Sequence, residues 1–383
     1  MKISINVPLN ELIKLRKEIH KTPELAGNEK NTSKRIIAFA KKFNPDKIIT
    51  NIGGNGLAVI FKGTGKGPTV LIRCELDALP ISESNKFSYR STKENVSHKC
   101  GHDGHLTIVS GLIPLLSKKK IKKGKVVLLY QPSEETGEGA ERILKDKKFS
   151  LIQPDFAFAL HNLPGFEKGK ILIREKEFAA ASKGMIIKLT GKTSHAAEPE
   201  RGINPALAVA EIISELTALP KNTKSIKDFS LVTIIHTKIG DRAFGTSPGY
   251  AEVMATLRSF KNEDMRILTN NAVKKVKGIS KKYGLKTDIS FTEEFPATVN
   301  ESKCVKMVKD AAMKNKLKIQ KIKTPFKWSE DFGHFTNHFK GALFGLGSGK
   351  SQPALHNPDY DFPDEIIEPG VRIFYSLIDK ILN

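Results

Sequence analysis

A recurring pattern restricts the fold of this chain: short apolar runs are each followed by residues that can bind a metal or move a proton. The runs cover residues 69–74, 125–130 and 156–160. They lead, in this order, into Glu75 and Asp77, into Glu134 and Glu135, and into His161. Helical patterns separate the runs, and strands that alternate with helices are typical of a sheet with its site along one edge. We therefore expect an α/β enzyme.

Residues 98–105, with the sequence HKCGHDGH, hold three histidines and a cysteine. One glycine separates Cys100 from His102, so both side chains can turn toward the same point. Thiolate and neutral imidazole are good ligands for zinc and similar ions. A polar, glycine-rich turn with surface histidines is the alternative, because short motifs of this kind also occur by chance. Further candidate ligands after later apolar runs, His161 and His356, favour the metal site.

Glu134 and Glu135 stand side by side after a buried-type strand. Such a pair is usually part of a solvated turn. Beside a metal, however, one carboxylate can bind the ion while the other takes a proton from water. Together with the cysteine and histidines, the pair supplies enough ligands for two ions.

The pattern of elements changes between residues 179 and 295. Four strand-like runs and two helical ones follow one another there in the order β-α-β-β-α-β, which is that of a ferredoxin-like sandwich. A chain of 383 residues is also long enough for two domains. We predict an inserted domain at residues 179–295 and a discontinuous catalytic domain made of residues 1–178 and 296–383.

The chain carries a net charge of +22, which raises the question of nucleic-acid binding. Its lysines are spread over nearly every segment. The one dense run has no interleaved aromatic residues and is better explained as a solvated loop; it comprises Lys118, Lys119, Lys120, Lys122, Lys123 and Lys125. We therefore expect no nucleic-acid partner.

Two features of the sequence indicate the cellular compartment of the protein. Residues 1–6 lack the apolar stretch of a signal peptide, and no segment is long enough to span a bilayer. The three cysteines, Cys74, Cys100 and Cys304, are odd in number and scattered, which argues against a disulfide framework. We expect a cytoplasmic protein without a membrane partner.

The sequence resembles the amidohydrolase branch of the dinuclear metallopeptidases, which includes N-acyl-amino-acid amidohydrolase, hippurate hydrolase and the auxin-conjugate hydrolases. Ordered motifs over nearly the whole chain carry the resemblance: RKEIHKTPEL (16–25), LDALPI (76–81), HKCGHDGH (98–105), YQPSEE (130–135), LHNLP (160–164), GKTSHAAEPERGINP (191–205), ATLRSF (255–260), EDF (330–332) and LHNPDYDF (355–362). It implies a zinc-peptidase-like catalytic domain with an inserted ferredoxin-like domain that serves as lid or dimerisation surface.

The resemblance also assigns roles to residues. It implies two divalent ions per subunit, zinc, manganese, nickel or cobalt, held by Cys100, His102, Glu135, His161 and His356. Glu134 becomes the general base, and Asp77 a supporting aspartate that orients the site. His195 is expected to bind substrate or to stabilise the developing oxyanion. Arg258 is a candidate for binding the substrate carboxylate, although a solvent-facing strand arginine fits that position equally well.

The activity implied is metal-dependent hydrolysis of N-acyl amino acids to a carboxylate and a free amino acid, using an activated water. The expected partners are a small N-acyl amino acid or short peptide as substrate and a second subunit bound through the inserted domain. A metallo-dipeptidase or carboxypeptidase of the same superfamily is the alternative. A catalytically silent relative is disfavoured, because such a protein need not retain every ligand and the base.

Four residues depart from the pattern of the branch. Glu75 stands where an aspartate is usual, and Cys74 replaces a small alanine beside it. Thr136 and Glu138 interrupt a nearly continuous glycine run. None removes a ligand or the base. We expect an active enzyme in which a bulkier, more acidic loop alters the pocket.

Overall fold

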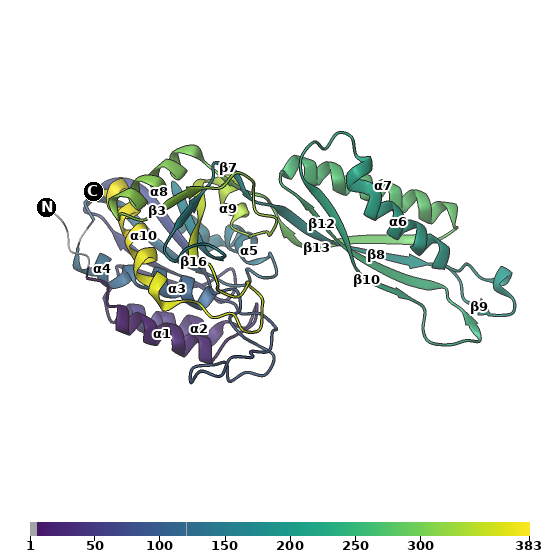
Figure 1. Ribbon diagram of the computed structural model, residues 1–383, viewed down its shortest axis with the longest axis horizontal. Coiled ribbons are helices and arrows are strands. Elements are labelled where there is room, and N and C mark those ends of the chain that lie inside the picture. The colour runs from purple at the N-terminus through teal and green to yellow at the C-terminus, as the bar shows by residue number, and fades with distance from the viewer. Residues whose placement is uncertain (1–5, 120) are drawn as a thin grey trace. The chain divides into compact units, whose positions relative to one another are not determined.

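The computed structural model describes residues 6–119 and 121–383. Lys120 of the lysine-rich run and residues 1–5 of the N-terminal segment lie outside the described residues. The chain divides into two compact units (Figure 1). The first unit comprises residues up to Phe178, Thr298–Thr324 and Asp331–Asn383; the second comprises Ala179–Ala297 and Pro325–Glu330.

An eight-stranded sheet forms the centre of the first unit, in the order β1-β2-β4-β3-β5-β16-β6-β15. Its strands are β1 (Lys47–Ile52), β2 (Gly56–Lys62), β3 (Gly65–Glu75), β4 (Lys123–Gln131), β5 (Phe156–Pro164), β6 (Ile171–Ile173), β15 (Ile319–Lys321) and β16 (Lys340–Gly349). Neighbours among β4, β3, β5 and β16 run parallel. The three apolar runs lie in β3, β4 and β5, so the prediction of strands is confirmed there. Because the four strands are parallel, their carboxyl ends meet at one edge.

Helices cover this sheet and explain why its strands are apolar on both faces. They are α1 (Leu9–Lys21), α2 (Lys30–Lys41), α3 (His102–Ser110), α4 (Leu112–Lys118), α5 (Gly139–Lys145), α8 (Ser302–Lys314), α9 (Gly333–His338) and α10 (Ile367–Leu382). The C-terminal helix α10 packs against α3, α4, α8 and two central strands. In α1, Leu12, Leu15 and Ile19 are buried at helical spacing, and the helix ends shortly before Pro23.

The second unit holds a four-stranded antiparallel sheet in the order β10-β12-β8-β13. Its strands are β8 (Ala181–Thr190), β10 (Ser230–Ile239), β12 (Tyr250–Ser259) and β13 (Lys286–Phe295), and its helices are α6 (Ala206–Asn222) and α7 (Asn262–Lys282). Burial alternates along β12, as expected for a sheet with helices on one face. The chain order β-α-β-β-α-β agrees with the sequence pattern, and the predicted α/β fold class is confirmed.

The second unit differs in extent from the predicted inserted domain. It continues to Ala297 and includes Pro325–Glu330, which the sequence analysis assigned to the catalytic domain. Backbone hydrogen bonds explain the difference: the N–H of Ala180 donates to the carbonyls of Phe326 and Trp328. Its role as lid or dimerisation surface stays a prediction. None of the helices in the described part of the chain has the length and hydropathy needed to cross a membrane.

Candidate metal centre

The carboxyl edge of the parallel strands gathers the predicted site residues of the first unit. Strand β3 has β4 on one side and β5 on the other, and such a reversal of strand order is where open α/β sheets form their sites. Asp77 follows β3, Glu134 and Glu135 follow β4, His161 lies near the end of β5, and His356 follows β16. Topology alone therefore brings these residues to one edge.

Gly101 allows Cys100 and His102 to face the same point. It is the residue before helix α3 and has a φ of +89°, in the left-handed region that favours glycine. A Cβ at this position would lie 2.6 Å from Oδ1 of Asn162. Both the conformation and the close approach require glycine between the two candidate ligands.

The five predicted metal ligands fall into two overlapping groups. Cys100, His102 and His161 form one group, and Cys100, Glu135 and His356 form the other; in each, the ligand atoms lie within 4.8 Å of one another. The first group is wholly buried. Thiolate, imidazole and carboxylate at this spacing suit zinc and similar divalent ions, and two groups suit two ions.

Hydrogen bonds aim the two buried imidazoles into the cluster. His102 donates from Nδ1 to the carbonyl of Asp77 at 2.9 Å, and His161 donates from Nδ1 to the carbonyl of Asn162 at 2.9 Å. This leaves Nε2 of His161 3.5 Å from the sulfur of Cys100. Nε2 of His102 is buried and has no hydrogen-bond partner among the described residues. A buried, unpartnered imidazole nitrogen of this kind fits a metal.

The carboxylates stand close to that nitrogen. Nε2 of His102 lies 3.7 Å from Oε2 of Glu134 and 3.8 Å from Oε1 of Glu135. Asp77 is fully buried, and its Oδ2 accepts the backbone N–H of Glu135 at 2.9 Å. Asp77 thus touches His102 and Glu135, and its supporting role stays a prediction.

The electrostatics of the cluster favour a cation. Burial acts to lower the pKa of His102, but the carboxylate of Asp77 and the charges of Glu75 and Glu135 outweigh burial and raise the pKa to about 10. Burial, reinforced by the neighbouring His105, lowers the pKa of His161 well below its usual value. The site therefore combines one neutral imidazole with a surplus of negative charge, which a divalent ion can neutralise.

His356 reaches the cluster from a loop. Its Nε2 lies 3.9 Å from Oε2 of Glu135, and its side chain is 52% exposed. Its φ is +66°, in the left-handed region that non-glycine residues seldom adopt. The backbone N–H of His356 donates to the carbonyl of Lys99 at 2.8 Å, which ties the loop to the segment that carries Cys100.

His195 and Arg258 belong to the second unit. His195 lies in β9 (Ser194–His195), is exposed, and accepts the N–H of Ala197 at Nδ1 over 3.1 Å. Arg258 is on β12 and donates to the carbonyl of Lys327 at 3.0 Å and to the hydroxyl of Ser329 at 3.1 Å. Burial lowers the pKa of Arg258. The guanidinium is partly covered by the segment Pro325–Glu330, which supplies both of these acceptors, and its role in binding substrate stays a prediction.

A buried charge cluster in the first unit was not predicted from the sequence. Arg73, on β3, donates to Glu75, to Oε1 of Gln131 at 2.8 Å and to Oδ1 of Asp331 at 2.5 Å. Burial would raise the pKa of Glu75, but the charges of Arg73 and His105 hold it far below its usual range. Glu75 therefore serves an ion pair. Its position just before the motif LDALPI, with Asp331 inside EDF, was the available signal.

The effect of the interrupted glycine run on the pocket stays a prediction. Glu138 is exposed and pairs with Arg142 at 2.5 Å, one helical turn further along. Its charge is therefore neutralised on the surface. Thr136 is partly buried and donates its hydroxyl to the carbonyl of Ser133 at 3.3 Å.

Comparison with known proteins adds to this geometry. The family model described as Peptidase family M20/M25/M40 matches residues 71–380. An uncharacterised hydrolase of Staphylococcus aureus (strain USA300) is 28% identical over 391 residues, covering 97% of this chain and 99% of the relative. Hippurate hydrolase of Campylobacter jejuni is 27% identical over 375 residues, covering 97% of each chain.

A solved structure agrees in fold. The Bacillus subtilis YXEP protein, described as a dinuclear metal binding peptidase from the M20 family, matches with a TM-score of 0.83 at 24% identity and covers 98% of both chains. The family model spans most of the chain, from within strand β3 into the C-terminal helix α10. The chain belongs to the peptidase family M20/M25/M40.

Proposed function

We propose that this protein is a metal-dependent amidohydrolase that cleaves the amide bond of N-acyl amino acids to a carboxylate and a free amino acid. The observation that carries the proposal is the buried Nε2 of His102, without a hydrogen-bond partner among the described residues, facing Glu134 and Glu135. The resemblance of the chain to a hippurate hydrolase supports an N-acyl amino acid as substrate.

Two divalent ions fit the candidate centre. Cys100, His102 and His161 would hold one, and Cys100, Glu135 and His356 the other. Zinc, manganese, nickel and cobalt all accept such ligands. When bound, the ions polarise the carbonyl of the scissile amide and lower the pKa of water.

Glu134 is the proposed general base. Its Oε1 accepts the backbone N–H of Asp331 at 3.4 Å, and its side chain is only 6% exposed. A carboxylate held this way can take the proton of the attacking water and return it to the leaving amine. Asp77 keeps the neighbouring ligands oriented through its contacts with His102 and Glu135.

The second unit supplies the proposed substrate contacts. Arg258 has neutral partners, and no carboxylate pairs with it in the part of the chain that the structure describes. A half-buried guanidinium of this kind suits the carboxylate of an amino-acid product. Nδ1 of His195 accepts a backbone N–H, so Nε2 carries the proton and is the atom that would donate to substrate. A homodimer through this unit and a cytoplasmic location are parts of the same proposal.

A dipeptidase or carboxypeptidase is the second candidate, since the matched family is described as a peptidase family. A substrate panel separates the two: N-acetyl-methionine, N-benzoyl-glycine, indole-acetyl-alanine and several dipeptides. Each is assayed after metal is stripped and again after zinc, manganese or cobalt is restored. Metal-restored release of amino acid from the acylated compounds supports the amidohydrolase. Cleavage of the dipeptides alone would move the protein to the peptidase side of the family.

A further inference from the structure

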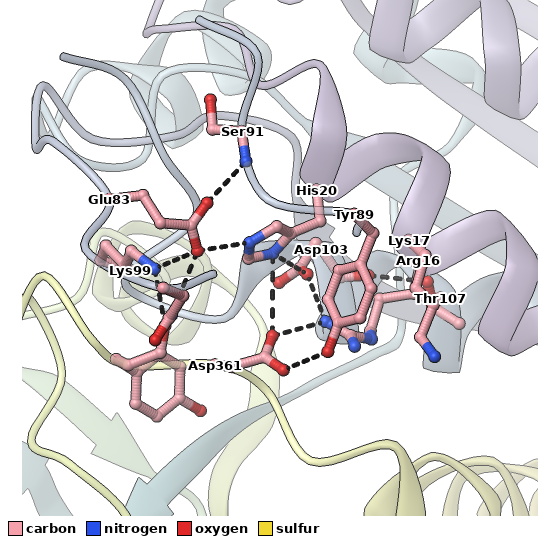
Figure 2. Close-up of polar contacts among 12 residues, drawn as sticks. Arg16, Lys17, His20, Glu83, Tyr89, Ser91, Lys99, Asp103, Thr107 and Asp361 are labelled. Atoms are coloured by element: carbon pink, nitrogen blue, oxygen red, sulfur yellow. Dashed lines mark hydrogen bonds and ion pairs between the residues drawn. The ribbon is translucent and has the colours of Figure 1, made fainter. Parts of the chain in front are cut away.

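Figure 2 shows a largely buried ionic cluster, two of whose members, Lys99 and Asp103, are next in sequence to the candidate ligands Cys100 and His102. Its members are charged or hydroxyl side chains from α1, from the loop after β3, from the start of α3 and from the loop that carries His356; they are Arg16, His20, Glu83, Tyr89, Lys99, Asp103 and Asp361. We call this set the Arg16 cluster. None of its members is a predicted ligand or base.

Arg16 joins two segments of the chain that carry ligands. Its side chain is fully buried, and Nη1 donates to Oδ2 of Asp103 and to Oδ1 of Asp361, both at 3.0 Å. Asp361 also accepts the hydroxyl of Tyr89 at 2.6 Å. Nε of Arg16 donates to Asp364 at 2.6 Å, which adds a second anchor on the same loop.

His20 and Lys99 complete the cluster. Both ring nitrogens of His20 face carboxylates, Nδ1 at 2.9 Å from Asp103 and Nε2 at 3.0 Å from Glu83, so both donate and the ring is charged. Lys99 donates to Glu83 at 2.5 Å and to the carbonyl of Tyr360 at 2.8 Å. Figure 2 shows these groups converging between α1 and the loop of Asp361.

Each anchored segment bears a candidate ligand. Lys99 precedes Cys100, Asp103 follows His102, and Asp361 lies on the loop of His356. His356 depends on this support, because its side chain is exposed and its backbone has the unfavourable φ of +66°. The Arg16 cluster therefore fixes how far the loop of His356 stands from Cys100 and His102.

The cluster has no room for a metal of its own. Ligand atoms of His20, Asp103 and Asp361 do lie within 4.8 Å of one another. The cation that faces both carboxylates is the guanidinium of Arg16, however, and His20 donates to Asp103. A buried ion pair often contributes little to the net free energy of unfolding. The role of the Arg16 cluster is therefore better explained as holding the loop in place than as stabilising the fold.

We propose that Asp361, held by Arg16 and Tyr89, is a positioning residue for His356 and sets the affinity of one of the two metal positions. The inference rests on the proposed function, because it takes the two ligand groups as metal sites. Only the group of Cys100, Glu135 and His356 depends on the anchored loop for a ligand. Loss of the contacts that hold this loop should thus lower the affinity for one ion and leave the affinity for the other unchanged.

The test compares Asp361→Asn with Asp359→Asn in the full-length, metal-free protein. Asp359 is a matched control: it lies on the same loop, is exposed, and forms no hydrogen bond or ion pair with the described residues. Co²⁺ is titrated against a competing chelator, and its absorption bands report each binding step. Wild type and Asp359→Asn should bind two ions alike. Asp361→Asn should bind one ion unchanged and the other about tenfold more weakly.

Two further variants separate positioning from general stability. His356→Ala should lose the same ion, and adding Asp361→Asn to it should bring no further loss in affinity. Tyr89→Phe keeps every charge and replaces Asp361→Asn as the test variant if Asp361→Asn does not fold. It should lower the affinity for the same ion roughly fivefold. The positioning role would be overturned if Asp361→Asn lowered the affinity for both ions equally. It would also be overturned if the losses in affinity caused by Asp361→Asn and His356→Ala were additive.

The same titration distinguishes failure of this inference from failure of the proposed function. A wild-type protein that binds fewer than two ions would overturn the metal centre and the inference together. Two ions in wild type, with both unchanged in Asp361→Asn and in Tyr89→Phe, would overturn the positioning role alone.

Discussion

His105 donates a hydrogen bond of 2.7 Å from Nδ1 to Oε2 of Glu75, and both side chains are buried below the candidate metal centre. Oε1 of the same carboxylate accepts from Arg73. One glutamate thus accepts hydrogen bonds from side chains of two different elements, β3 and α3. The departure from the aspartate usual in this branch therefore has a structural use in this chain.

Glu75→Gln should destabilise the protein by about 3–5 kcal/mol, because it removes one of the two carboxylates that pair with the buried Arg73 and leaves only Asp331. Urea unfolding of the metal-free protein measures the change. Glu138→Gln is the matched control: Glu138 is exposed, and its pair with Arg142 should contribute no more than about 0.5 kcal/mol. Equal losses in the two variants would contradict the structural role of Glu75.

Glu134→Gln should retain both metal ions and lose about 10²–10⁴-fold in kcat, because the amide cannot take a proton from water. Metal content by atomic emission and turnover of N-benzoyl-glycine are measured on the same sample. Near wild-type turnover would refute the assignment of the base. Loss of metal would instead show that Glu134 is a ligand.

Arg258→Met should raise KM for N-benzoyl-glycine about 10–100-fold, since a charge-assisted hydrogen bond to the substrate carboxylate is lost. N-benzoyl-glycinamide has no carboxylate, so its KM should hardly change. Arg266→Met is the control, because Arg266 is an exposed arginine of the same unit, on α7. An equal effect on acid and amide substrates would exclude carboxylate recognition by Arg258.

The stability of the metal-free protein should depend on pH through His20. Burial acts to lower the pKa of His20, but hydrogen bonds to Asp103 and Glu83 outweigh burial and raise the pKa from 6.5 to about 9. The charged ring therefore stabilises the fold fully below pH 6.5, and this contribution disappears as the pH rises through 9. It amounts to about 3 kcal/mol.

The measurement is the free energy of unfolding of wild type and of His20→Gln between pH 6 and 9.5. The gap between the two proteins should narrow by about 3 kcal/mol over this range. His236→Gln, at an exposed position on β10, should follow wild type throughout. A gap that stays constant with pH would show that His20 is not charged by its carboxylate neighbours.

Sequence patterns predicted the candidate site because the residues expected in it follow strands. Asp77, Glu134 and Glu135 come directly after apolar runs, and parallel strands bring their carboxyl ends together. The fold class was predictable for the same reason. Both conclusions depend on local periodicity and on the chain direction of neighbouring strands.

The buried charges were not predictable in this way. Arg73 and Asp331 are 258 positions apart, and no local pattern pairs them. Arg16 lies on the apolar face of α1 with Leu12 and Ile19. No local pattern pairs it with Asp103, 87 positions away, or with Asp364, 348 positions away. The segment Pro325–Glu330 joins the second unit through backbone hydrogen bonds, which leave no trace in the sequence.

The most direct test of the account is a titration of metal into the stripped protein while hydrolysis of N-acetyl-methionine and N-benzoyl-glycine is followed. The account predicts negligible release of amino acid without metal and a rise that ends at two ions per chain. Hydrolysis that proceeds without metal, or two bound ions with no cleavage of any acylated amino acid in the panel, would contradict it.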